Sequence, residues 1–96
     1  MKFEWDERKN EENIEKHKVS FDIAKTVFDD KSAKYFYDTE HSDDEERFIV
    51  IGMAEIINQE LYVCYCMRGE NEEITRIISA RRATKQEIKL YMEGRL

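Results

Sequence analysis

Residues 74–84 read ITRIISARRAT, and this stretch decides the fold of the chain. Its first half is rich in isoleucine and threonine, β-branched residues that favour an extended strand. Its second half gathers arginines where that strand should end. Thr84 and Glu87 then have the spacing of a capping box, in which each side chain accepts a hydrogen bond from the backbone N–H of the other residue. The sequence therefore predicts a strand over residues 74–80 that leads into a C-terminal helix. Ile88, Tyr91 and Met92 fall on one face of this helix.

The strand over residues 74–80 has partners upstream. Residues 47–53 and 61–67 are further strand-like runs, and short connections of hairpin length join the three. Such spacing predicts an antiparallel meander. The aromatic run at residues 35–37 begins the sheet, which brings the expected total to about four antiparallel strands.

The N-terminal third predicts a short strand followed by a helix. Phe3 and Trp5 alternate with acidic residues, which is the period of a half-buried strand. Asp6 can cap a helix over residues 7–17, because its carboxylate can accept from exposed N–H groups at the helix start. Asn10, Ile14 and His17 line one face of it. Only one of the three is apolar, so we expect this helix at the rim of the core.

A second helix is expected over residues 21–29, with Val19 as a hydrophobic staple and Ser20 as the cap. Phe21, Ala24, Val27 and Phe28 recur at helical spacing along it. Such a stripe is the normal signal of a face that packs on a sheet. The predicted fold is α+β, with a short N-terminal strand, two N-terminal helices, the antiparallel sheet and a C-terminal helix.

Length and composition set the class of protein. Ninety-six residues form a single domain over 1–96, and 40% of them are charged against 41% hydrophobic, so a partner can complete part of the apolar surface. No run approaches the roughly 20 apolar residues of a membrane span, and the charged N-terminus lacks the apolar run of a signal peptide. We therefore expect a cytoplasmic protein.

Cys64 and Cys66 share one face of a strand beside Tyr62, where they act as small apolar packing groups.

Charge is unevenly distributed along the chain. The net charge is −6, yet residues 74–96 contain six basic and two acidic side chains, so the acidic excess lies upstream. Six carboxylates fall within residues 38–46. Calcium loops need ligands at alternate positions and a glycine turn, and these residues include no glycine. A solvated acidic loop is predicted instead. No cluster of carboxylates and histidines elsewhere has metal-ligand spacing, and no cofactor is predicted.

The basic C-terminal quarter favours an anionic ligand, because the planar guanidinium group matches phosphate oxygens and stays charged. An RNA backbone is the leading candidate. Strict alternation places Arg76 and Arg81 on opposite faces of their strand, unless the strand twists or ends between them. Arg68, across the hairpin, can approach one of them. One of Arg81 and Arg82 is expected to bind phosphate and the other to pair with a carboxylate.

Several side chains could transfer protons. Glu87 is either the capping residue or a base, and Tyr91, one helical turn later, is either a donor or a packing ring. His17 and His41 are the only imidazoles. His17 sits at a helix end, which gives it a plain structural role, and His41 lies in the acidic loop, where it could cap a turn through Ser42.

Short motifs throughout the chain carry a family resemblance. They are Phe3-Glu4-Trp5-Asp6, Asn13, Lys16-His17, Val19-Ser20-Phe21, Val27-Phe28-Asp29-Asp30, His41-Ser42, Glu46-Arg47, Arg68-Gly69 and residues 76–84. In this order and spacing the chain resembles the BrnT family of bacterial type II toxins. The resemblance implies a RelE-like fold, a small ribonuclease, and inhibition by a BrnA-type antitoxin. That antitoxin is expected to carry a DNA-binding domain, so that the complex represses its own operon and contacts DNA only indirectly.

Together, the residues and the resemblance give a specific expectation for the site. We expect RNA to be cleaved without metal, by attack of a ribose 2′-hydroxyl on the adjacent phosphate, and independently of the ribosome. The candidate catalytic residues are Arg76, Arg81, Glu87 and Tyr91, and the candidate phosphate-binding residues are Arg68, Arg82 and Lys85. The alternative is a catalytically weak interaction module that serves as the folded partner of a repressor, which the acidic net charge favours.

Overall fold

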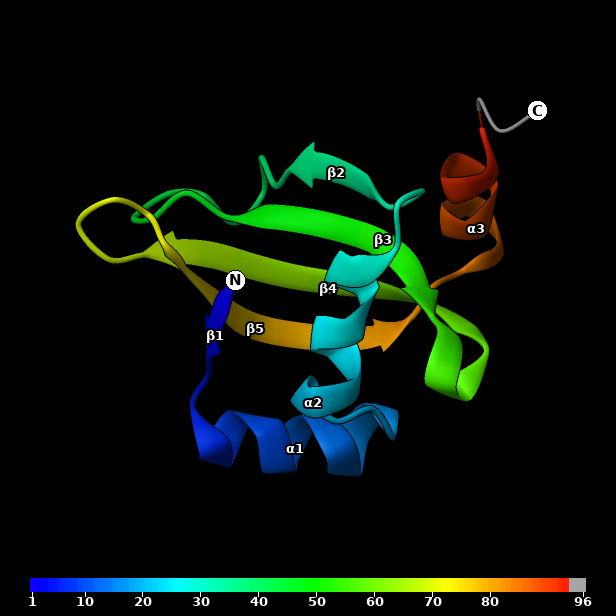
Figure 1. Ribbon diagram of the computed structural model, residues 1–96, viewed down its shortest axis with the longest axis horizontal. Helices are drawn as coiled ribbons and strands as arrows, with labels where there is room; N and C mark the ends of the chain where they lie inside the picture. The colour runs from blue at the N-terminus through cyan, green and yellow to red at the C-terminus, as the bar shows by residue number, and fades with distance from the viewer. Residues whose placement is uncertain (94–96) are drawn as a thin grey trace.

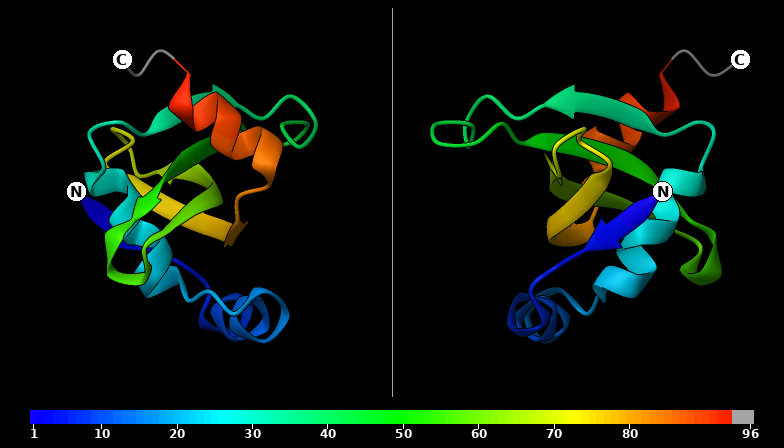
Figure 2. Two further views of the ribbon diagram at one scale, coloured as in Figure 1. Left: turned by 90° about the vertical axis from the view of Figure 1, so that its right-hand side faces the viewer. Right: turned by 60° about the vertical axis from the view of Figure 1, so that its left-hand side comes forward.

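The computed structural model describes residues 1–93. In chain order the elements are β1 (Lys2–Glu4), α1 (Glu7–His17), α2 (Phe21–Ala24), the 3-10 helix η1 (Lys25–Asp29), β2 (Lys34–Tyr37), β3 (Phe48–Ala54), the 3-10 helix η2 (Glu55–Ile57), β4 (Gln59–Arg68), β5 (Ile74–Arg82) and α3 (Lys85–Met92). Figure 1 and Figure 2 show a twisted sheet with α2 across one face, α1 beyond the edge at β5 and α3 at one end. The predicted α+β class is confirmed. Within the described chain, no helix is long and apolar enough to cross a membrane.

The sheet has five strands in the order β1-β5-β4-β3-β2. Strands β2 to β5 form the predicted antiparallel meander, but β1 pairs with β5 in parallel. The expectation of about four antiparallel strands was therefore wrong, and the sheet is mixed. The alternation of Phe3 and Trp5 indicates a strand but carries no information about its partner, which lies some 70 positions away in the sequence.

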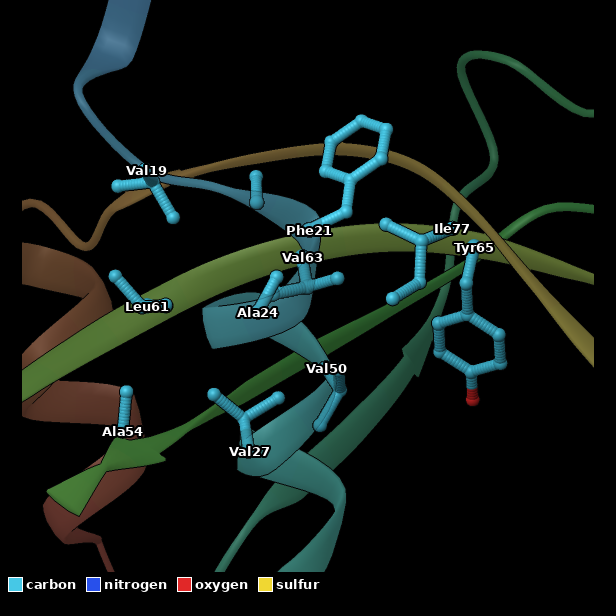
Figure 3. Close-up of a cluster of buried hydrophobic side chains, with 11 residues drawn as sticks. Val19, Phe21, Ala24, Val27, Val50, Ala54, Leu61, Val63, Tyr65 and Ile77 are labelled. Carbon is cyan, nitrogen blue, oxygen red and sulfur yellow. The ribbon is translucent and has the colours of Figure 1, made fainter. Parts of the chain in front are cut away.

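The core lies between one face of the sheet and the segment α2–η1. Side chains from α2, η1, β3, β4 and β5 converge in Figure 3. The predicted apolar face is confirmed, because Phe21, Ala24 and Val27 are fully buried. A continuous α-helix over residues 21–29 was not correct, since the helix tightens into a 3-10 helix at Lys25. The Thr26 hydroxyl donates to the carbonyl of Ile23 at 2.6 Å, a back-bond of the kind that bends helices.

Gly52 lets this segment approach the sheet closely. A Cβ atom at Gly52 would lie 3.0 Å from both the Cβ and the carbonyl oxygen of Val27. Only a residue without a side chain leaves η1 this close to β3.

Helix α1 protects the edge of β5 beyond β1. The Asn13 amide donates to the carbonyl of Ala80 at 2.8 Å and accepts from its N–H at 3.1 Å, as a neighbouring strand would. It also donates to the carbonyl of Val19 at 2.8 Å. The prediction that Asn10 and Ile14 share the inward face of α1 was partly wrong. Asn10 is buried, but Ile14 is 42% exposed, and Asn13 is buried in its place. Hydrogen bonds from buried amides, rather than an apolar stripe, anchor this helix.

Helix α3 begins with the predicted capping box. The Thr84 hydroxyl accepts from the N–H of Glu87, and the Glu87 carboxylate accepts from the N–H of Thr84. Tyr91 is buried and donates to the Asp30 carboxylate at 2.6 Å, whereas Met92 is half exposed. The same carboxylate accepts from the N–H of Met53 at 2.8 Å. Asp30 thus joins α3 to β3.

Asn13→Ala should lower the free energy of unfolding by roughly 2–4 kcal/mol, because it leaves the buried N–H and C=O of Ala80 without partners. Ile14→Ala, at the neighbouring exposed position, should cost less than about 1 kcal/mol. Urea unfolding of the two variants measures both values. Equal losses would show that the amide bridge does not anchor α1.

Candidate nucleic-acid interface

A β-bulge in β5 determines which arginines share a face. Tyr65 pairs with Ile77 and Cys64 pairs with Ser79, so Ile78 has no partner across the ladder. The extra residue reverses the alternation, and Arg81 therefore projects from the same face as Arg76. The expectation of opposite faces was wrong because it assumed an unbroken period of two. This face lies opposite the one that packs on α2 and η1.

The arginines of this face lie at the two ends of the sheet. We call Arg47, Arg68 and Arg76 the loop-end cluster, because they lie beside the turn at residues 69–73 and the acidic loop. Arg81 lies at the other end, beside α3, whereas Arg82 pairs with the core residue Leu61 and so projects from the opposite face. Arg76 and Arg81 are separated by roughly 13–17 Å along the strand, given the rise of about 3.3 Å per residue. The structure therefore does not bring the candidate residues together into one site.

Strand register builds the loop-end cluster. Cys66 pairs with Arg76, and Phe48 pairs with Tyr65, so Arg47 occupies the next position across from Cys66. Neighbouring strands lie about 4.8 Å apart, which places the Cα atoms of Arg47 and Arg76 about 10 Å from each other. A pocket of about 170 Å³ opens among the three arginines. Its other lining residues are Asp6, Lys9, Glu45, Ile77 and Ile78.

Two of these three arginines have carboxylate partners. Arg76 Nη1 lies 2.7 Å from Glu4 Oε2, and Arg68 Nη2 lies 3.0 Å from Glu45 Oε2. All four side chains are partly exposed, and such exposed pairs contribute only about 0–1 kcal/mol each. An anionic ligand can therefore replace either carboxylate at small cost.

Arg47 is the exception within the cluster. Its Nε is buried and has no hydrogen-bond partner among the described residues. A buried guanidinium N–H without an acceptor is costly, so a rearrangement of the Arg47 side chain that brings this N–H to a ligand oxygen is favoured. Arg47 was missing from the sequence-based candidates. It is the only lysine or arginine within residues 35–67, and that isolation was the signal that could have drawn attention to it.

At the other end of the sheet, Arg81 is held more tightly than the arginines of the loop-end cluster. Arg81 donates to both carboxylate oxygens of Glu87, at 2.8 and 2.9 Å, and stacks 4.0 Å from the centre of the Tyr62 ring. The hydrogen bonds from Arg81 lower the pKa of Glu87, aided by the N–H of Thr84. Arg82 donates to the side chain of Gln59 at 3.0 Å. Lys85 is exposed in the first turn of α3.

The predicted acidic loop contains one buried carboxylate. Asp38 is 7% exposed and lies 3.0 Å from His41 Nδ1, so this position of the loop is not solvated as expected. The Cys64 thiol also donates to Asp38, at 3.8 Å. Burial, together with the charge of Asp38, raises the pKa of Cys64 to about 11, which keeps the thiol protonated and unreactive. Both cysteines are buried, as predicted for packing groups.

Hydrogen bonds of Ser42 connect the acidic loop to Arg47 of the loop-end cluster. The Ser42 hydroxyl accepts from the N–H of Arg47 at 3.0 Å and donates to the carbonyl of Asp38. The turn is thus capped by Ser42, with His41 bound to Asp38 rather than acting through Ser42. No group of three or more His, Cys, Asp or Glu side chains within residues 1–93 is arranged to hold a metal ion.

Comparison with known proteins identifies the family. The family model described as "Ribonuclease toxin, BrnT, of type II toxin-antitoxin system" matches residues 5–87. Among solved structures, the crystal structure of the Brucella abortus ribonuclease toxin BrnT is similar, with 30% sequence identity and a TM-score of 0.67 over 88% of this chain and 99% of that one. No curated protein sequence matches the chain significantly. The match over most of its length shows that this chain belongs to the BrnT family of ribonuclease toxins of type II toxin–antitoxin systems.

Proposed function

We propose that the protein is a ribosome-independent endoribonuclease that cleaves RNA without a metal ion, and that the loop-end cluster binds the scissile phosphate. The observation that carries this proposal is the convergence of Arg47, Arg68 and Arg76 on one pocket, with a buried donor of Arg47 unsatisfied. Attack of a 2′-hydroxyl on the adjacent phosphate gathers negative charge on the phosphate oxygens. Guanidinium groups already in position stabilise that charge in the transition state.

The remaining candidate residues fall into an exposed pair and a group whose side chains are already engaged within the fold. Arg82 and Lys85 are exposed at the far end of the sheet, where they can contact the flanking RNA backbone. Glu87 already accepts hydrogen bonds from Arg81 and from the N–H of Thr84, and Tyr91 is buried against Asp30. We assign Arg81, Glu87 and Tyr91 to fixing α3 on the sheet rather than to proton transfer.

The family implies an antitoxin. We propose one of the BrnA type that acts in the cytoplasm and covers the arginine face, by which we mean the sheet face that carries Arg47, Arg68, Arg76 and Arg81. Its own DNA-binding domain would let the complex repress the operon. Exposed apolar groups outside the cluster support a protein partner. Three consecutive aromatic residues of the edge strand β2, Tyr35, Phe36 and Tyr37, are 38–53% exposed. Exposed aromatic side chains are typical anchors of protein interfaces.

A second candidate function is a catalytically weak interaction module that serves as the folded partner of a repressor. The observation that favours it is the pairing of Arg68, Arg76 and Arg81 with carboxylates of the chain itself. Such pairing lowers the positive potential that RNA would meet. Cleavage measurements separate the two functions, because an interaction module keeps its partner binding but cuts no RNA.

Arg76→Ala should reduce cleavage of a fluorogenic RNA in excess EDTA by roughly 10²-fold, the usual loss when one oxyanion donor is removed. Lys31→Ala provides the control, because Lys31 is exposed in the turn after η1 and does not line the pocket of the cluster. Induced expression should arrest bacterial growth for the wild type and the control but not for Arg76→Ala. Equal cleavage by both variants would remove Arg76 from the site.

Glu87→Gln should leave cleavage within about threefold of the wild type and lower stability modestly at pH 7. Glutamine still completes the capping box but loses the ion pair with Arg81. The folded state lowers the pKa of Glu87, so the stabilisation is present above its ordinary value of 4.5 and is lost as the pH falls below it. Urea unfolding at pH 7 and pH 3 should therefore show a difference only at pH 7. A loss of 10²-fold or more in cleavage would instead identify Glu87 as a base.

A further inference from the structure

We propose that His41 is the proton-transfer residue of this site and that Asp38 positions it. The inference rests on the proposed RNA cleavage and supplies the base that cleavage requires. His41 Nδ1 lies 3.0 Å from Asp38 Oδ2 and 3.3 Å from Oδ1. Because a carboxylate only accepts, the imidazole that pairs with it carries its proton on Nδ1. Nε2 is then the free lone-pair site, on a side chain that is 60% exposed.

Asp38 is held firmly enough to orient the ring. It is nearly buried at the end of β2, and its N–H donates to the carbonyl of Arg47 at 2.9 Å. Its carboxylate also accepts from the N–H of Glu40 at 3.2 Å and from the Cys64 thiol. An imidazole oriented by a buried carboxylate, with its second nitrogen open to solvent, is the arrangement that supports general base catalysis.

The position of His41 connects it to the arginine cluster. A surface hollow lined by Glu40, His41, Asp43, Asp44, Glu45 and Arg47 adjoins the pocket of the loop-end cluster, and Glu45 and Arg47 line both. A phosphate bound by Arg47 therefore places the neighbouring ribose near the imidazole. His17 lines a different hollow, between α1 and the bulge of β5, and makes no described pair with a carboxylate.

The chemistry balances without a further reactant. His41 Nε2 takes the proton of the 2′-hydroxyl as O2′ forms a bond to phosphorus and the bond from phosphorus to O5′ breaks. The leaving O5′ takes a proton from solvent, and the imidazolium returns its proton to solvent. The products are a 2′,3′-cyclic phosphate and a 5′-hydroxyl end.

The test is metal-free RNA cleavage in EDTA by the wild type, His41→Ala and the control His17→Ala. His41→Ala should cut roughly 10²- to 10⁴-fold more slowly, while His17→Ala should stay within about twofold. Free imidazole in the buffer should restore part of the His41→Ala activity, which a purely structural histidine would not allow. Binding of a 2′-deoxy oligonucleotide should remain unchanged, and circular dichroism should confirm the fold.

Asp38→Asn tests the positioning role. This variant should keep the fold and lower kcat while leaving KM unchanged, the split expected of a residue that orients the base and does not itself bind RNA. Wild-type activity in His41→Ala would overturn the inference and leave the proposed function standing. A wild-type protein that binds but does not cut RNA would overturn both. A matched 10²-fold loss in His17→Ala would move the base to the other hollow.

Discussion

The extra residue in β5, Ile78, is the constraint on which the arrangement of the arginine face depends. Without it, Arg76 and Arg81 would project from opposite faces, and Ala80 would leave the core. The bulge is held from outside the sheet, because the Asn13 amide bridges both backbone groups of Ala80 two residues later. The anchoring of α1, the packing of the core and the direction of the arginines are therefore consequences of one local irregularity.

Along the face that the bulge creates, the two ends differ in how firmly their arginines are held. Arg81 is fixed by two hydrogen bonds to Glu87 and by stacking on Tyr62, and these contacts attach α3 to the sheet. At the loop end the ion pairs are single, exposed and easily exchanged, and Arg47 has a buried N–H without an acceptor. The end beside α3 is therefore suited to stabilising the fold, and the loop end is suited to binding a ligand. The acidic loop, in which Asp38 holds His41, borders the loop end.

Local signals in the sequence predicted local structure well. The capping box, the meander and the buried face of α2 depend on residues close in the chain, and all three are confirmed. The bulge, the parallel pairing of β1 and the burial of Asp38 depend on distant contacts, so alternation and charge counts could not reveal them. The same limit applies to the site. Strand register decides which of the candidate arginines meet: Arg76 lies beside Arg68, as the hairpin allowed, and beside Arg47, while Arg81 lies at the other end of the strand.

The most direct test of the arginine face is an NMR titration that observes the Nε–H signals of the arginine side chains. A short RNA carrying a 2′-deoxy sugar at the scissile position binds without being cut. Addition of this RNA should shift the signals of Arg47, Arg68 and Arg76, with the buried Nε–H of Arg47 moving most as it gains an acceptor. The signal of Arg81 should stay in place. Shifts confined to Arg81 and Arg82 would place RNA beside α3 and contradict the account.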